Sequence, residues 1–371
     1  MINNFPFIYL IIYLLLFILH IFSTFLNYEK RTKDFLLLIT WIFLAIFSGT
    51  RVCVGGDWLG YRDLFRSENN LNFELFSTDP TETLFRLIAF ITNYLGFSFE
   101  FFNLVISFLT CLFLFLGIRK ISINYSFLFT LLYFSIMYFN HQFGIIRTGL
   151  AVSIYLYSLS FLNNKTKYLG LGLINYNIHN TSIFPFLMTF ILNKKINKYF
   201  AFVIFFLSFF LIFKSDILLN GLLSFLDISN SKYINYADAA DRYLEKTRIT
   251  NTTFIIIGIF LFYLYKKIKI DILYVNLTVF YIIVNLTFPY QAILGRLNAF
   301  LLIPVWIFIF KFMDRVNSQT KIFITTLLVF YSFTALSLIL FDKDLALFRH
   351  YQTWLFDFNI TFDQCSTEFQ F

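Results

Sequence analysis

The sequence predicts an all-α polytopic membrane protein with about ten transmembrane helices, a re-entrant helical hairpin and an interfacial amphipathic helix. Of its 371 residues, 59% are hydrophobic and 13% are charged, whereas about 25% of the residues in a typical soluble domain are charged. The chain contains 56 Phe and 23 Tyr, which is more apolar surface than one water-facing core can bury. Lipid must therefore cover much of the chain, and a soluble enzyme is excluded.

Ten apolar segments approach the length of about 20 residues that a spanning helix needs. They are residues 5–26, 35–50, 99–118, 125–140, 143–162, 199–213, 252–265, 272–288, 297–312 and 322–341. The first segment follows no basic region and has no Ala-x-Ala cleavage site. It is therefore expected to be a retained helix rather than a signal peptide.

Two further apolar stretches fit a spanning helix poorly. Residues 83–97 carry Arg86 and have the spacing of an amphipathic helix. Residues 168–192 are interrupted by a polar group: Asn175, Asn177, His179 and Asn180. The distribution of charge indicates how the chain passes through both stretches.

Six basic connections assign the two sides of the membrane, because positively charged connections lie on the cytoplasmic side. They are Lys30/Arg31/Lys33, Arg119/Lys120, Lys165/Lys167, Lys194/Lys195/Lys198, Lys266/Lys267/Lys269 and Lys311/Arg315/Lys321. All of them lie inside only if residues 83–97 lie along the outer interface and residues 168–192 enter and leave on the same side. A re-entrant hairpin of that kind is possible where protein or a watery cavity covers its backbone.

Residues 1–371 are thus expected to form one polytopic membrane domain with both termini outside. Its outer parts are loops at 51–98 and 214–250, and a tail at 342–371. The inner connections carry 13 Lys and 3 Arg, whereas 9 Arg and 4 Lys remain outside. Lysine therefore marks orientation, and arginine lies where chemistry can occur on the outer face. The alternative is that the outer loops are merely longer and more varied.

Motifs for several kinds of chemistry are missing. The three cysteines form no CxxC, and no His-rich tract or metal-ligand spacing is present, so we expect no metal site. No phosphate-binding loop, dinucleotide fingerprint or GxSxG motif occurs, and no matched pair of broken helices indicates an inverted-repeat transporter. The net charge of +8 is spread over membrane connections, and no nucleic-acid partner is expected. Cys53 and Cys365 are both expected outside, where oxidation can join them.

The first outer loop contains a candidate sugar-binding segment. Paired glycines at 55 and 56 permit a tight turn, after which Asp57 can cap a short helix. The spacing places three aromatic residues on one face of that helix, as a platform for the apolar face of a sugar ring, and puts two arginines one turn apart. These are Trp58, Tyr61 and Phe65, with Arg62 and Arg66. The alternative is that Asp57 pairs with Arg51 and only ties the loop down.

Three more residues are candidates for chemistry near the outer face. Arg147 lies about one turn inside an apolar helix, where a guanidinium usually faces a cavity or a partner. His179 lies at the tip of the expected hairpin and can accept a proton or donate a hydrogen bond to a phosphate. Arg296 starts another apolar helix, and its planar fork can hold two phosphate oxygens. The alternatives are a structural histidine and an arginine that extends to the interface.

In these residues the chain resembles the EpsG family and, more broadly, the Wzy-type polysaccharide polymerases of bacterial O-antigen and capsule pathways. The resemblance covers about residues 45–300. It rests on an Arg-x(5)-Asp-x(3)-Tyr loop (Arg51, Asp57, Tyr61), an Ile-Arg-x-Gly-Leu-Ala helix (146–151), a His-x-Thr break (His179, Thr181) and the pair Arg296-Leu297. The chain departs from the family in Gly56-Asp57-Trp58, where Gly-Thr-Asp-Tyr is common, and in Thr148, where Gln is usual.

This resemblance implies a membrane glycosyltransferase that acts on undecaprenyl-diphosphate-linked oligosaccharides at the periplasmic face of the bacterial inner membrane. A hydroxyl group of one lipid-linked repeat attacks the anomeric carbon of the growing chain and releases undecaprenyl diphosphate. The diphosphate bond supplies the energy, so neither a cofactor nor a metal is implied. A membrane protein that regulates chain length is a candidate partner.

The resemblance also implies roles for the candidate residues. Arg147 and Arg296, with Arg51, neutralise the leaving diphosphate; Trp58, Tyr61 and Arg62 contact substrate; Asp57 or His179 is the general base. The alternative function is a lipid-linked oligosaccharide flippase or another polysaccharide-export membrane protein. A flippase needs access from both faces, and the arginine bias toward one face argues against it.

Overall fold

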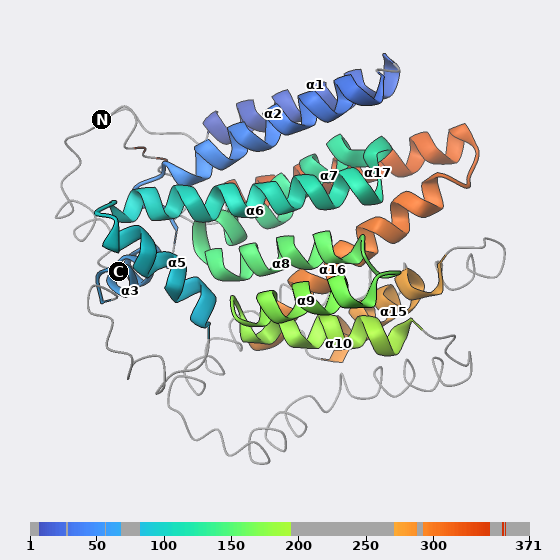
Figure 1. Ribbon diagram of the computed structural model, residues 1–371. Helices are drawn as coiled ribbons and strands as arrows, with labels where there is room; N and C mark the ends of the chain where they lie inside the picture. The colour runs from blue at the N-terminus through green and yellow to red at the C-terminus, as the bar shows by residue number, and fades with distance from the viewer. Residues whose placement is uncertain are drawn as a thin grey trace. The chain divides into compact units, whose positions relative to one another are not determined.

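The structure, a computed structural model, describes residues 7–26, 29–55, 57–67, 82–193, 271–287, 292–341, 351 and 353, with backbone only at 285–287 and 292–296. Every regular element in these residues is helical, apart from one isolated bridge between Arg51 and Thr353 (Figure 1). The predicted all-α class is confirmed for this part of the chain. Two compact units are present: the first comprises Met1–Asn180 and Ser318–Phe371, and the second comprises Thr181–Asn317.

Four helices of the first unit are long and apolar enough to cross a membrane: α1 (Phe7–Phe25), α2 (Lys30–Gly49), α6 (Phe99–Ile121) and α17 (Ser318–Phe341). They coincide with the spans predicted at 5–26, 35–50, 99–118 and 322–341. Their lengths of 19, 20, 23 and 24 residues match the roughly 20 residues that a bilayer requires. The chain is therefore a membrane protein.

Two close helix contacts of the first unit depend on glycine. Helix α6 lies beside α2 and beside α8 (Ile146–Leu159) (Figure 1). A Cβ atom at Gly49 would lie 2.7 Å from Leu104 Cα, and one at Gly117 would lie 2.7 Å from Leu156 Cγ. Small residues of this kind let membrane helices approach closely, because packing rather than water exclusion drives their association.

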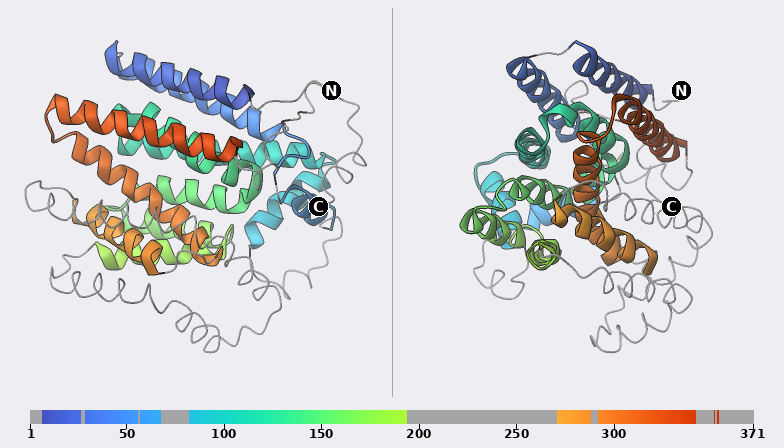
Figure 2. Two further views of the ribbon diagram at one scale, coloured as in Figure 1. Left: turned by 180° about the vertical axis from the view of Figure 1, so that it is seen from behind. Right: turned by 90° about the vertical axis from the view of Figure 1, so that its right-hand side faces the viewer.

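The remaining spans predicted for the first unit have different boundaries. The segment 125–140 begins with α7 (Ser126–Tyr133), which packs against α1 and α17 (Figure 2). It continues as a π-helix over Phe134–Gly144, and Ile145 separates this π-helix from α8. A π-helix has one more residue in each hydrogen-bonded turn than an α-helix and is frequently found at functional sites. Hydropathy alone does not distinguish the two.

Three lysine-rich connections meet at one end of the first unit. Arg119 at the end of α6 forms an ion pair with Asp34 at the start of α2, with 2.7 Å between Nη2 and Oδ2. Lys120 Nζ lies 4.1 Å from the centre of the Phe161 ring, which follows α8, and Lys167 Nζ lies 5.6 Å from the same ring. This grouping agrees with the prediction that these three connections lie on one side of the membrane.

The two stretches that fitted a span poorly are short helices. Residues 83–97 contain α5 (Thr83–Tyr94), and its interfacial position stays a prediction. Helix α9 (Lys165–Tyr176) ends at the polar break, where the backbone N–H groups of Ile178 and His179 both donate to Asn175 O. The interruption at 177–179 is confirmed, and the same-side entry and exit of 168–192 stays a prediction.

The second unit contains three described helices that pack on one another: α10 (Ile183–Leu192), α15 (Ile272–Thr287) and α16 (Ala292–Met313). Asn276 Nδ2 donates to Leu192 O at 2.7 Å, and Lys311 pairs with Asp271. Helices α15 and α16 correspond to the spans predicted at 272–288 and 297–312. The segments 199–213 and 252–265 lie outside the described residues.

Gly149 allows α8 to pack against the end of the π-helix, because a Cβ atom there would lie 2.3 Å from His141 O. We expect Gly149→Ala to lower the free energy of unfolding by about 1–3 kcal/mol through overpacking. Gly170→Ala is the matched control, because nothing lies within 4 Å of its added Cβ and alanine favours a helix by about 1 kcal/mol. Thermal unfolding in detergent measures both, and equal midpoints would contradict the tight packing at Gly149.

The second prediction concerns the path of residues 168–192. Single cysteines at Lys165 and Lys194 should both react with a membrane-impermeant thiol reagent only after the cytoplasmic side has been opened, because basic residues flank the segment on both sides. Labelling of the two positions from opposite sides would show that the segment crosses the membrane. Every later connection would then lie on the side of the membrane opposite to the one predicted here.

Candidate functional site

The end of the first unit opposite the lysine-rich connections carries the short helix α3 (Trp58–Ser67). The predicted aromatic face exists, since Trp58, Tyr61 and Phe65 are all buried on it. Its rings pack against protein: Trp58 lies 5.3 Å from Phe99 and Tyr61 lies 5.9 Å from Phe85, between ring centres. This face therefore anchors α3 on α5 and α6, and it is not open for a sugar ring to stack on.

The polar candidates of this loop lie nearer to solvent. Asp57, directly before α3, is exposed. The Arg62 guanidinium lies 5.4 Å from the centre of the Trp58 ring, and its Nε is 3.8 Å from Asp63 Oδ1. The alternative pairing of Asp57 with Arg51 does not occur, because the three Arg51 nitrogens donate to backbone carbonyl groups instead.

Arg51 is an internal residue with an exposed fraction of 1%. Its Nη1 donates to Ser48 O at 2.6 Å, Nε to Val54 O at 3.2 Å and Nη2 to Phe143 O at 3.4 Å. Burial lowers the pKa of Arg51 to about 10, so the group remains charged at neutral pH. Arg51 thereby joins the loop after α2 to the last turn of the π-helix.

The same loop contacts a segment near the end of the chain. Tyr351 stacks on Phe47 with 4.3 Å between ring centres and donates a hydrogen bond to Phe47 O at 2.6 Å.

Cys53 is disulfide-bonded and Cys111 is free. Because the chain has three cysteines, the remaining cysteine is Cys365, which lies outside the described residues.

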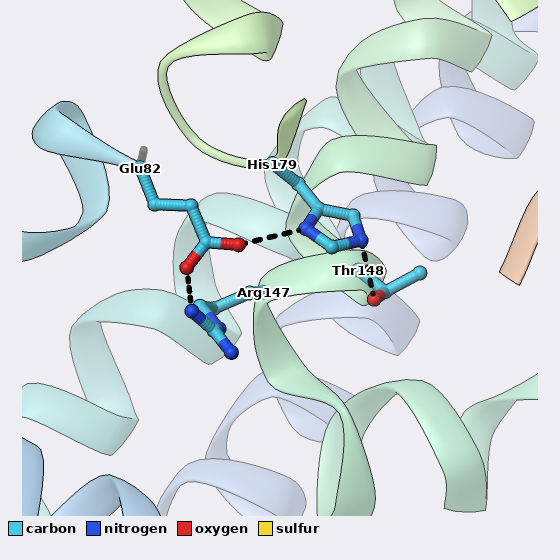
Figure 3. Close-up of polar contacts among 4 residues, drawn as sticks. All are labelled: Glu82, Arg147, Thr148 and His179. Carbon is cyan, nitrogen blue, oxygen red and sulfur yellow. Dashed lines mark hydrogen bonds and ion pairs between the residues drawn. The ribbon is translucent and has the colours of Figure 1, made fainter. Parts of the chain in front are cut away.

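Four side chains, those of Glu82, Arg147, Thr148 and His179, form a polar cluster (Figure 3). The Glu82 carboxylate forms an ion pair with Arg147 through Oε2, and its Oε1 lies 3.0 Å from His179 Nδ1. The other ring nitrogen of His179, Nε2, lies 3.3 Å from Thr148 Oγ1. Three segments far apart in the sequence therefore meet at one carboxylate.

Local structure places each member of this cluster. Glu82 is the residue before α5 and has a left-handed backbone with φ of 71°. Arg147 and Thr148 belong to the first turn of α8, and His179 follows the break after α9. The break itself is held by two bonds: Asn175 Nδ2 donates to Ala151 O at 2.9 Å, and Leu84 N donates to Asn177 O at 2.9 Å.

Tyr61 connects α3 to the cluster. The Arg147 guanidinium lies 5.5 Å from the centre of the Tyr61 ring and 5.9 Å from that of Phe85. Burial raises the pKa of Tyr61, and the nearby Arg147 charge acts in the opposite direction. Tyr61, Arg147 and His179, which the sequence predicts as functional residues, thus lie together.

The members of the cluster differ in their access to solvent. The exposed fraction of the side chain is 28% for Arg147, 12% for Glu82 and 3% for His179. Arg147 Nε is buried and has no hydrogen-bond partner among the described residues. Arg147 and Glu82 are therefore the members of the cluster that are most accessible to solvent.

Glu82 is the member that sequence reasoning missed. The segment beginning at 83 is read as an amphipathic surface helix, and an acid just before such a helix resembles the many acids of an outer loop. One feature of the sequence could have identified Glu82. It is an acid at the start of an apolar helix, where a carboxylate is favourable, in a chain whose membrane-edge arginines need charged partners.

Other predicted site features lie outside this cluster. The backbone of Arg296 belongs to α16 in the second unit, and its side chain lies outside the described residues. Its role in diphosphate binding stays a prediction. Within the part of the chain that the structure describes, no three His, Cys, Asp or Glu residues are grouped as metal ligands.

Comparison with protein families matches the chain to the model of the EpsG family over residues 34–353. This range includes most of α2, all members of the cluster and α17. Comparison with curated proteins and with solved structures finds no match.

The environment of Arg51 leads to a prediction about stability. Arg51→Ala should lower the free energy of unfolding by about 3 kcal/mol or more, because three buried carbonyl oxygens each lose a donor at about 1–3 kcal/mol. Arg31→Ala, at an exposed position in the first turn of α2, is the control and should stay within about 0.5 kcal/mol. Thermal unfolding in detergent measures both, and an unchanged midpoint for Arg51→Ala would mean that its bonds do not hold the loop.

Proposed function

The chain belongs to the EpsG family, and from this premise we propose that it is a polysaccharide polymerase of the Wzy type. It transfers a growing glycan from undecaprenyl diphosphate onto the next lipid-linked repeat of an O-antigen or capsule, at the periplasmic face of the bacterial inner membrane. Membership in the family supports a polysaccharide-related membrane protein, and the site supports the choice of reaction.

The observation that carries this proposal is the grouping of Arg147 and His179 around Glu82, with Tyr61 against Arg147. These groups lie at the end of the first unit away from Arg119, Lys120 and Lys167, which the positive-inside rule places in the cytoplasm. The Arg147 side chain is 28% exposed, and a partly exposed guanidinium suits an anionic substrate that arrives from the outer side.

The proposed reaction is a substitution at the anomeric carbon of the growing chain. An acceptor hydroxyl group forms the new glycosidic bond, and the bond between that carbon and the diphosphate oxygen breaks. Negative charge accumulates on the leaving diphosphate, and Arg147 stabilises it through charge-assisted hydrogen bonds. Arg296 is a second candidate for this contact, whereas Arg51 acts indirectly by holding the outer loop.

Substitution of Arg147 tests the proposal. Arg147→Ala should reduce glycan polymerisation by about 100-fold or more, and Arg147→Lys should restore little, because an ammonium group cannot reproduce the planar fork of the guanidinium. Glycan length on gels from a deletion strain complemented with each variant, at equal protein level, provides the measurement. Arg31→Ala, an exposed arginine in the first turn of α2, is the matched control and should give normal chains.

The same deletion strain separates the two functions. Loss of a polymerase leaves single repeats on the cell surface, whereas loss of a flippase leaves none there. Absence of surface repeats would reject the proposed polymerase, and near-normal chains in Arg147→Lys would reject the bidentate contact.

A further inference from the structure

The cluster contains a carboxylate whose position indicates a role in the proposed reaction. Glu82 contacts both Arg147 and His179, and its backbone adopts a left-handed conformation that is rare for a residue with a side chain. Such backbone strain costs about 1–3 kcal/mol and occurs preferentially at functional sites. The protein therefore holds Glu82 toward these two groups at a cost in stability.

Access distinguishes Glu82 from the other acid-base candidates. Both ring nitrogens of His179 already face protein groups, Glu82 and Thr148, and the exposed fraction of Thr148 is 2%. Asp57 is exposed at the start of α3, but it is not a member of the cluster. Glu82 is a partly accessible carboxylate in direct contact with the proposed diphosphate-binding arginine.

We propose, on the basis of the polymerase function above, that Glu82 is the general base for the acceptor hydroxyl group. The O–H bond of the acceptor breaks, its oxygen bonds to the anomeric carbon, and the proton moves to the Glu82 carboxylate. The bond to the diphosphate breaks with its electron pair remaining on the leaving group. Glu82 returns the proton to water after the products leave.

Arg147 couples the two halves of this step. Before substrate arrives, the Glu82 carboxylate neutralises the guanidinium, which would otherwise be an unpaired charge beside apolar helices. When Glu82 takes the proton it loses its negative charge, and at the same moment the diphosphate gains charge. Arg147 thereby loses its negatively charged partner Glu82 and becomes able to pair with the leaving diphosphate.

His179 is a positioning residue in this scheme. Its Nδ1 contacts Glu82 Oε1 and its Nε2 contacts Thr148, so the ring connects the carboxylate to α8. Among the described residues, the charged and titratable groups that face Glu82 are Arg147 from α8 and His179 from the end of α9. Beyond Arg147 lie Tyr61 from α3 and Asp57, whose charge acts on Tyr61. A change in the protonation of His179 therefore also affects the base.

The test is an assay of the purified full-length protein with synthetic lipid-diphosphate-linked repeats. Glu82→Gln should extend glycans at least about 100-fold more slowly than wild type, as loss of a general base predicts, while binding the lipid-linked donor within about threefold. Glu100→Gln, at the start of α6, is the matched control and should match wild type. The rate of Glu82→Ala should rise when formate is added, because a small carboxylate can accept the proton in the space left by the side chain.

The outcomes separate this inference from the proposed function. No extension by the wild-type protein would reject the polymerase itself. Extension by wild type together with a Glu82→Gln rate within about tenfold of it would reject only Glu82 as base. Failure of formate to restore Glu82→Ala, with a thermal midpoint equal to that of wild type, would likewise reject the base role. If the rate of glycan extension falls further in His179→Gln than in Glu82→Gln, the general base is His179 rather than Glu82.

Discussion

The arrangement of the end of the first unit that carries α3 depends on the ion pair between Glu82 and Arg147. A guanidinium at the start of an apolar helix is costly unless a counter-charge or water compensates for it. Glu82 supplies that charge and also contacts His179, so one carboxylate joins the start of α5, the start of α8 and the break after α9. Other polar contacts join the same segments, because His179 Nε2 lies 3.3 Å from Thr148 Oγ1 and Leu84 N donates to Asn177 O. Among the described residues, however, Glu82 is the counter-charge that reaches Arg147, the neighbour of Tyr61 in α3.

Two arginines that look alike in the sequence have different physical roles. The Arg51 guanidinium is surrounded by protein and donates to three carbonyl groups, so its hydrogen-bonding capacity serves the loop. Arg147 retains an exposed fraction of 28% and pairs with a carboxylate. A guanidinium that pairs with a carboxylate can exchange that partner for an incoming anion. A guanidinium that donates to three backbone carbonyl groups cannot do so without disrupting the fold.

Part of the site can be predicted from the sequence because local patterns carry it. The i, i+3, i+7 spacing correctly groups Trp58, Tyr61 and Phe65, and the polar break correctly marks His179 as an unusual position. The same patterns do not say what a face meets, and the aromatic face of α3 meets Phe85, Phe99 and Phe102. Helical periodicity determines which residues share a side, but only the neighbouring helices determine whether that side is open.

The sequence by itself determined the membrane class, the apolar helices and the end of the first unit at which the lysines gather. These properties follow from the composition and charge of short segments, because apolar segments partition into lipid and basic segments stay in water. The tertiary structure alone decided that Glu82 lies against Arg147 and His179, that Arg51 is internal, and that a π-helix precedes α8. Glu82 and His179 are 97 positions apart, and no local property of either segment specifies a contact that depends on how the intervening helices pack.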